Sequence, residues 1–366
     1  MINLKFFPSR HLATYMVRLF VTRSLAVLIA LVLILMTLDL LGESGKILAV
    51  PGNGDADLWR YVGLRLPLLF SRFLPFSVLL GALIAFVGLN QHSEVVAMKA
   101  SGLSAHQILA PLVVASIGIS IALFAFNETI VVKSARVVNA WSDNDYKPVP
   151  PDSGVLSNVW VLSGDDLIRA GLVVGGPPNL RVERLTIYDR AGGVLQRVYR
   201  AARATPGPGS AWTLQDVTIY DANMNVVRHV PRMMGMDGIT TGQLTLAKVD
   251  PNQLDYSTLK RRAAELEAAG RPADEARAGL AHKITGPLST LLMPLLAAVA
   301  AFGLARSGQV LLRACLGMAL GFAYFVADNF SLAMGNAGAY SPLIAAWAPF
   351  LLFLLIGETV LVRTEE

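Results

Sequence analysis

Six long apolar runs constrain the fold of this 366-residue chain more than any other feature. A helix needs roughly 20 apolar residues to cross about 30 Å of hydrocarbon. The composition agrees, because 54% of the residues are hydrophobic and 16% are charged, whereas about a quarter are charged in an ordinary soluble domain. We therefore predict an α-helical membrane bundle of six transmembrane helices in two groups of three, at residues 24–41, 62–89, 108–126, 286–304, 310–334 and 342–362.

Basic residues on one side of these runs predict the orientation. The segment before the first run contains bases and no acid. It is too basic and too extended for the start of a cleaved signal peptide, and no small-residue cleavage site follows. Under the positive-inside rule both termini lie in the cytoplasm. The bases concerned are Lys5, Arg10, Arg18 and Arg23 before the first run, Arg306 and Arg313 after the fourth, and Arg363 in the tail.

A polar segment at residues 127–283 separates the two groups of runs and is far too long to be a loop. Its middle reads as short strands at residues 158–162, 166–170, 181–189, 194–202 and 212–221, with turn residues at 151–154, 175–178, 192–193 and 206–209. This spacing predicts an antiparallel sandwich or roll on the outer side. An Ala-rich stretch at residues 257–269 predicts a surface helix that leads back to the membrane. The predicted divisions are residues 1–126, 127–283 and 284–366.

A short polar interruption at residues 91–107 lies between the second and third runs, on the predicted cytoplasmic side. Ser93 is a candidate N-cap, Glu94 places an acid in the first turn, and Gly102 offers a left-handed stop. These signals predict a two-turn helix at about residues 93–104. Such a helix either lies on the membrane surface or docks on a soluble partner.

The two faces of this helix favour docking. At helical spacing Glu94, Ala97, Met98 and Ser101 share one face, and the other face mixes two valines with Lys99. A helix lying on lipid would show a cleaner apolar stripe with basic flanks. An ordinary interfacial connector is the alternative.

Motifs for catalysis are missing from the sequence. It contains no GxxxxGK[ST] loop, HExxH, GxSxG or CxxC, and the GESGK at residues 42–46 lacks the spacing of a nucleotide site. The five histidines have no repeated ligand spacing, and Cys315, inside an apolar run, is expected to be a packed core thiol. The net charge of +5 comes without the dense basic tract that nucleic acid requires. We expect no catalytic residues, metal or cofactor in this chain.

Three blocks carry a family resemblance: SEVVAMKASGLS at residues 93–104, HKITGPLSTLLMPLLAAVAAF at 282–302, and GMALGFAYFVADNFSLAMGNAGAYSP at 317–342. With three spans on each side of a β-rich insertion, the chain resembles the LptF/LptG permease family of the lipopolysaccharide exporter over essentially its whole length. Residues 249–271 are more similar to the LptG branch, and the LptF branch is the nearest alternative. The resemblance implies a periplasmic β-jellyroll for the inserted domain.

The resemblance also implies a function. The chain would be the permease subunit of an inner-membrane ABC transporter, paired with an LptF-type paralogue and seated on a dimer of the ATPase LptB, which binds the ATP. It would extract lipopolysaccharide from the outer leaflet and pass it to the periplasmic bridge proteins LptC and LptA. The helix at about residues 93–104 would be the coupling helix, which contacts the ATPase. Its contact residues would be Ser93, Glu94, Met98, Lys99 and Gly102.

Charged residues at membrane depth are the candidate lipopolysaccharide contacts. An arginine at mid-membrane costs about 2.5 to 3.5 kcal/mol on insertion scales, so Arg72 is expected to face a cavity or an anionic partner. Arg65, at the interface, is equally compatible with snorkelling. The family has bases near the outer end of the first span, whereas this chain has Asp39 and Glu43 and only Lys46. Lys46 and the two arginines take over that role, or the glycolipid carries different charges.

Further polar and small residues mark the fifth span. Asp328 and Asn329 either line the lipid path or close a contact between helices, and we favour the second interpretation. Gly317 and Gly321 form a small-xxx-small step suited to close packing.

A hypothesis from another class is a membrane-anchored sensor or scaffold whose outer domain binds a periplasmic ligand. It explains the missing catalytic motifs equally well, but it does not require a capped helix between the second and third spans. Co-purification of an ATPase subunit separates the two.

Overall fold

The structure is a computed structural model that describes residues 8–148, 156–175, 180–207, 211–236, 239, 241, 244, 250–268, 271–302 and 310–363. The chain divides into two compact units. Unit 1 comprises Met1–Leu41, Arg65–Val132 and Leu254–Glu366, and unit 2 comprises Gly42–Leu64 and Lys133–Gln253. This division differs from the predicted domains in three places, because residues 42–64 belong to unit 2 and residues 127–132 and 254–283 belong to unit 1.

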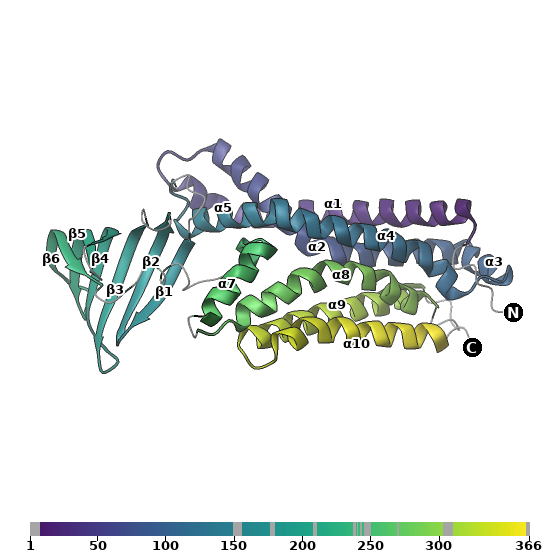
Figure 1. Cartoon of the computed structure of the whole chain (residues 1–366). Coiled ribbons are helices and arrows are strands. Elements are labelled where there is room, and N and C mark those ends of the chain that lie inside the picture. The colour runs from purple at the N-terminus through teal and green to yellow at the C-terminus, as the bar shows by residue number, and fades with distance from the viewer. Residues whose placement is uncertain are drawn as a thin grey trace. The chain divides into compact units, whose positions relative to one another are not determined.

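Unit 1 is helical (Figure 1). Among the described residues, six helices are long and apolar enough to cross a membrane, which confirms the predicted number. In chain order the elements are α1 (Arg10–Leu48), α2 (Asp55–Gln91), α3 (Glu94–Ala100), α4 (Ala105–Phe126), the π-helix η1 (Asn127–Val131), α7 (Tyr256–Ala268), α8 (Asp274–Phe302), α9 (Val310–Asn336) and α10 (Pro342–Arg363), with α1 and α2 running on into unit 2. The short α7 confirms the predicted surface helix.

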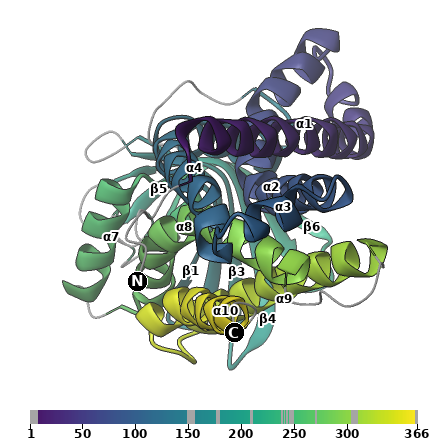
Figure 2. The ribbon, with the colours of Figure 1, turned by 90° about the vertical axis from the view of Figure 1, so that its right-hand side faces the viewer.

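Helix α8 lies at the centre of the bundle. Its most apolar window is 78% buried, against 17% for α1 and 22% for α9, so those two helices keep most of their apolar surface on the outside. Figure 2 looks onto the end of unit 1 where α3 and the end of α10 face the viewer. The core beneath them includes Phe86, Ile108 and Leu296, which are fully buried.

Glycines let neighbouring helices approach closely. A Cβ atom on Gly317 would lie 2.5 Å from Leu83, and one on Gly321 would lie 2.0 Å from Leu79, both on α2. This confirms the predicted small-xxx-small packing step. Cys315, two residues before Gly317, is exposed, so the prediction of a packed core thiol was wrong. An apolar span that faces outward accommodates a thiol as readily as a core does.

Unit 2 contains a six-stranded antiparallel sheet in the order β1 to β6. Helix α5 (Val132–Asp143) precedes the sheet in the sequence. The strands are β1 (Leu156–Ser163), β2 (Asp166–Val174), β3 (Arg181–Ala191), β4 (Val194–Pro206), β5 (Trp212–Asp221) and β6 (Val226–Gly235). An antiparallel sheet domain inserted between the third and fourth spans agrees with the predicted fold class. Strand β6 escaped the sequence analysis because Pro231 lies inside it, and a proline is tolerated in an edge strand.

One of the predicted turns can be checked fully. Gly192 and Gly193 have φ angles of 58° and 78° between β3 and β4, as a tight hairpin turn requires. The turns at residues 151–154, 175–178 and 206–209 fall wholly or partly outside the described residues.

Three strands of the sheet each contain one residue in the left-handed conformation, and the alternation of buried and exposed side chains in β3 is interrupted there. Asn158, Arg184 and Asp216 have φ angles of 52°, 56° and 57° in β1, β3 and β5. A non-glycine residue in this conformation costs of order 1 kcal/mol, so its repetition indicates a built bend. In β3 the buried Val182 and Leu185 are consequently three residues apart instead of two.

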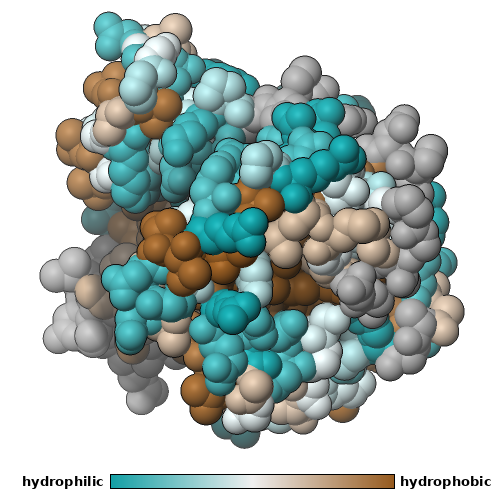
Figure 3. All heavy atoms as spheres, turned by 90° about the vertical axis from the view of Figure 1, so that its left-hand side faces the viewer, coloured by the Kyte–Doolittle hydropathy of each residue, from teal (hydrophilic) through white to brown (hydrophobic). Residues whose placement is uncertain are grey.

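The sheet buries one hydrophobic face. Val159, Val161, Leu185 and Ile187 belong to its core cluster. Trp212 is also in the cluster and donates its indole N–H to the carbonyl oxygen of Ile239 at 2.8 Å. Figure 3 looks onto this end of the molecule and shows hydrophobic atoms set back between hydrophilic ones.

The closest helix approach in unit 1 gives a stability prediction. A Cβ atom on Gly81 of α2 would lie 2.5 Å from the backbone Cα and N of Ser24 on α1. Gly81→Ala must therefore push the two helices apart, and we expect it to lower stability by about 1 to 3 kcal/mol. Gly118→Ala is the matched control, because a Cβ there meets nothing within 4 Å. Thermal unfolding in detergent should separate the two variants, and equal melting temperatures would contradict the packing.

Candidate functional site

Helix α3 is anchored to the bundle by two side chains. Val95 and Met98 are 4% and 6% exposed and belong to the core cluster of unit 1. On the other side Val96 is 65% exposed and Lys99 is exposed. The predicted assignment of faces was therefore wrong, since Met98 packs into the bundle and the exposed face carries Val96, Ala97 and Lys99.

The C-terminal end of α3 has the predicted stop, and its N-terminal end lacks the predicted cap. Gly102 has a φ of +88° and, with Leu103, closes the helix by bonds to the carbonyls of Lys99 and Met98, as predicted for a left-handed stop. Ser93 does not act as the predicted N-cap, because its φ is 58° and its side chain makes no capping bond. A full capping box lies one helix later, between Ser104 and Gln107 at the start of α4.

Polar contacts connect the α3 region to other helices of unit 1. The hydroxyl of Tyr15 on α1 donates to Glu94 Oε1 at 3.3 Å. His106 Nε2, at the start of α4, lies 3.3 Å from Glu358 Oε2 on α10. These contacts hold the segment in place within unit 1. Whether Ser93, Glu94, Met98, Lys99 and Gly102 contact an ATPase stays a prediction.

The candidate lipid contacts fall into three different environments. Arg65 donates from Nε and Nη2 to both carboxylate oxygens of Asp39 at 3.1 Å, and both side chains are partly buried. Lys46 pairs with Glu43 at 2.8 Å. Arg72 is exposed and has no hydrogen bond or ion pair within the part of the chain that the structure describes.

Asp328 on α9 faces a neighbouring helix. Its side chain is 13% exposed, and Oδ2 lies 4.0 Å from Nε2 of His282 on α8. Asn329 donates to the carbonyl oxygen of Phe325 in its own helix at 2.7 Å. The geometry favours a structural role for Asp328 in joining α8 to α9, and its contact with lipid remains a prediction.

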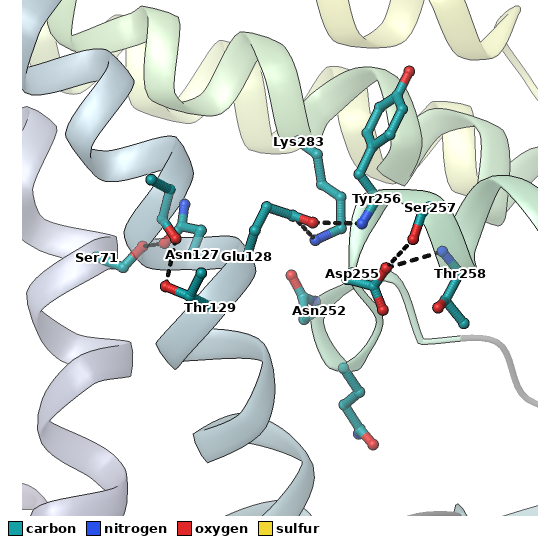
Figure 4. Close-up of polar contacts among 12 residues, drawn as sticks. Ser71, Asn127, Glu128, Thr129, Asn252, Asp255, Tyr256, Ser257, Thr258 and Lys283 are labelled. Carbon is teal, nitrogen blue, oxygen red and sulfur yellow. Dashed lines mark hydrogen bonds and ion pairs between the residues drawn. The ribbon is translucent and has the colours of Figure 1, made fainter.

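A polar cluster around η1 was missed by the sequence analysis (Figure 4). Glu128 accepts from Lys283 Nζ at 2.7 Å with one carboxylate oxygen and from the backbone N–H of Tyr256 at 2.5 Å with the other. The Glu128 and Lys283 side chains are 16% and 12% exposed. One carboxylate thus connects η1 to the start of α7 and to α8.

The residues on either side of Glu128 are also engaged. The hydroxyl of Ser71 on α2 donates to Asn127 Oδ1 at 2.5 Å, and the hydroxyl of Thr129 donates to the carbonyl oxygen of Ala125 at 2.6 Å. We call Asn127, Glu128 and Thr129 the η1 triplet. A lone acid and a lone base at the two borders of the polar segment, Glu128 and Lys283, were the available sequence signal.

Asp255 caps α7 next to this cluster. Its Oδ2 accepts from the Ser257 hydroxyl at 2.5 Å and from the Thr258 backbone N–H at 3.1 Å. These bonds, the one from Ser257 most of all, hold the pKa of the Asp255 carboxyl well below its ordinary value. The cap places the Tyr256 N–H so that it points to Glu128.

The fold and these sites define a class: a polytopic membrane protein with an extramembrane sheet inserted between its third and fourth spans. The family model for the lipopolysaccharide export system permease LptF/LptG matches residues 14–363, and the chain belongs to this family. The chain is 27% identical to the lipopolysaccharide export system permease protein LptG of Escherichia coli strain K12 over 360 residues, 96% of this chain and 95% of that protein. It is 24% identical to the LptG of Haemophilus influenzae over 325 residues, 86% and 89% of the two chains. The family resemblance is confirmed.

The Asp255 cap gives a pH-dependent prediction. Because the folded-state pKa is lowered, the cap stabilises the protein fully above the unfolded-state value of about 3.9 and loses this effect as the pH falls towards the folded-state pKa. Asp255→Ala should cost about 1 kcal/mol at pH 7. Thermal unfolding at stepwise lower pH should show the gap between parent and variant narrowing below about pH 4. A gap that is constant over this range would contradict the assignment.

Proposed function

We propose that this chain is the permease subunit of an ABC transporter that extracts lipopolysaccharide from the outer leaflet of the inner membrane, driven by ATP hydrolysis in a separate subunit. The family match over residues 14–363 carries the proposal. The family is that of the lipopolysaccharide export system permeases, and we propose that an ATPase acts on the exposed face of α3. An LptF-type paralogue, an LptB dimer, LptC and LptA are the proposed partners.

The proposed orientation puts α3 in the cytoplasm. The start of α1 and the end of α10 lie at the same end of unit 1 as α3 (Figure 1). Arg10, Arg18 and Arg23 near the start of α1 make this the basic end. The sheet unit then belongs to the periplasm.

The proposed docking element is the exposed face of α3, which carries Val96, Ala97 and Lys99. Val95 and Met98 fix the helix on the bundle, so force applied to Val96, Ala97 and Lys99 passes to α2 and α4 on either side. Small Ala97 permits close approach of a partner backbone. We expect Glu94 to pair with a basic residue of the ATPase. A rigid, anchored helix transmits a push better than a mobile loop does.

Arg72 is the basic residue best placed for an anionic lipid. It lies 19 residues before the α3 end of α2, which is about 28 Å along the helix and therefore near the far interface. A planar guanidinium binds phosphate with two parallel hydrogen bonds. Arg65 is already neutralised by Asp39, so we assign it a secondary part.

The apolar face of the sheet suits the next step of the route. An open roll can shelter acyl chains in its apolar interior, while its edge strands pair with a following protein. Val159 and Leu185 are buried in the core of the sheet unit, so we assign them to the core and not to lipid contact. LptC and LptA are the proposed receivers in the periplasm.

Substitutions on α3 test the ATPase contact. Val96→Glu adds a charge to the proposed interface, and we expect the detergent-extracted chain to lose most of its co-purifying ATPase subunit. Val194→Glu in β4 is the matched control, because Val194 is 63% exposed and Val96 is 65% exposed. Glu94→Arg should in addition impair growth of cells that depend on this chain. Undiminished ATPase in the Val96→Glu preparation, with normal growth of Glu94→Arg cells, would remove the transporter reading.

Arg72→Ala tests the lipid contact. We expect photo-crosslinking of lipopolysaccharide from a photoreactive residue at Leu68, about one turn away, to fall several-fold. Arg65→Ala should have a smaller effect because Asp39 already holds that side chain. Equal crosslinking in the parent and in Arg72→Ala would show that Arg72 does not bind the cargo.

A further inference from the structure

The η1 triplet lies where the chain leaves unit 1 for the sheet. The first unit ends at Val132, directly after η1, and resumes at Leu254, directly before α7. Glu128 contacts both places, since it belongs to η1 and accepts the N–H of Tyr256. The outgoing and returning connections are therefore joined by one carboxylate, within unit 1.

The π-helical turn is an unfavourable conformation that needs support. A π-helix contains an extra residue per turn and occurs mostly as single-turn insertions in α-helices. Here the Val132 N–H bonds to the carbonyl of Asn127, five residues back. The Thr129 hydroxyl occupies the carbonyl of Ala125, which further loosens the regular pattern of α4.

Two side chains and one backbone N–H, from three elements, supply that support. Ser71 of α2 holds Asn127, Lys283 of α8 holds Glu128, and the start of α7 donates to the same carboxylate (Figure 4). A partly buried carboxylate that loses its partners leaves an unpaired charge on both sides. The contacts of Glu128 therefore favour the π register over the α register.

We propose that Glu128 is a latch that keeps η1 in its π register and fastens α7 to it. When the latch opens, η1 relaxes to α-helical hydrogen bonding and the first turn of α7 separates from it. The chain connections at Val132 and Leu254 are then no longer joined. This inference rests on contacts within the chain and is independent of the transported cargo.

Hydrogen exchange of the purified full-length chain in lipid nanodiscs tests the latch. Glu128→Gln leaves Lys283 without its counter-charge, and we expect exchange to rise about tenfold in the peptides that cover residues 125–133 and 254–262 together. Glu267→Gln is the matched control. It removes another ion pair between α7 and α8, that of Glu267 with Arg277, which is more exposed, and it should change neither peptide. Unchanged exchange in Glu128→Gln, or a rise in α7 alone, would overturn the proposal.

A distance measurement checks the same opening by another route. The chain has a single cysteine, so spin labels at Ile130→Cys and Lys260→Cys can be placed in a Cys315→Ser background. The distance distribution should be narrow in the parent and broadened or shifted by Glu128→Gln. If that variant does not fold, Glu128→Gln with Lys283→Met leaves no unpaired charge and still lacks the latch, so the same broadening is expected. A narrow, unshifted distribution in the variant that folds would contradict the latch.

Discussion

The carboxylate of Glu128 is the interaction on which the junction of the fold depends. A membrane bundle must satisfy its polar backbone internally, and an irregular helical turn at its edge is tolerated only where other groups stabilise it. Glu128, with Lys283 and the Tyr256 N–H, provides this where the chain departs towards the sheet and returns from it. The bundle can therefore carry a large insertion between its third and fourth spans without losing its own packing.

At the opposite end of unit 1 the same principle appears in apolar form. Val95 and Met98 bury α3 on the bundle, and the capping box of Ser104 fixes the start of α4. The exposed remainder of α3 combines apolar Val96, small Ala97 and basic Lys99. Input at α3 and the latch at η1 thus lie at the two ends of one helix, α4, which the proposed transporter could use as a rigid lever.

Much of this architecture was predictable, and the failures have physical causes. Apolar length alone predicted the six spans, and short strand-like runs between turn residues predicted five of the six strands that the structure describes. The prediction of which face of α3 is exposed was wrong, because a helix of seven residues contains too little periodicity to reveal what it packs against. The capping box at Ser104 and Gln107 was readable and overlooked. The pairing of Glu128 with Lys283 joins residues 155 positions apart, and it depends on a π-helical turn that no local pattern announces.

We propose that ATP hydrolysis in a partner subunit drives lipopolysaccharide out of the membrane through this chain. The most direct measurement is the ATP-dependent release of lipopolysaccharide from proteoliposomes that contain this chain with its co-purified subunits. We predict release to a periplasmic acceptor only when the chain, ATP and the partner ATPase are all present. Equal release from liposomes that lack this chain, or release that does not depend on ATP, would contradict the claim.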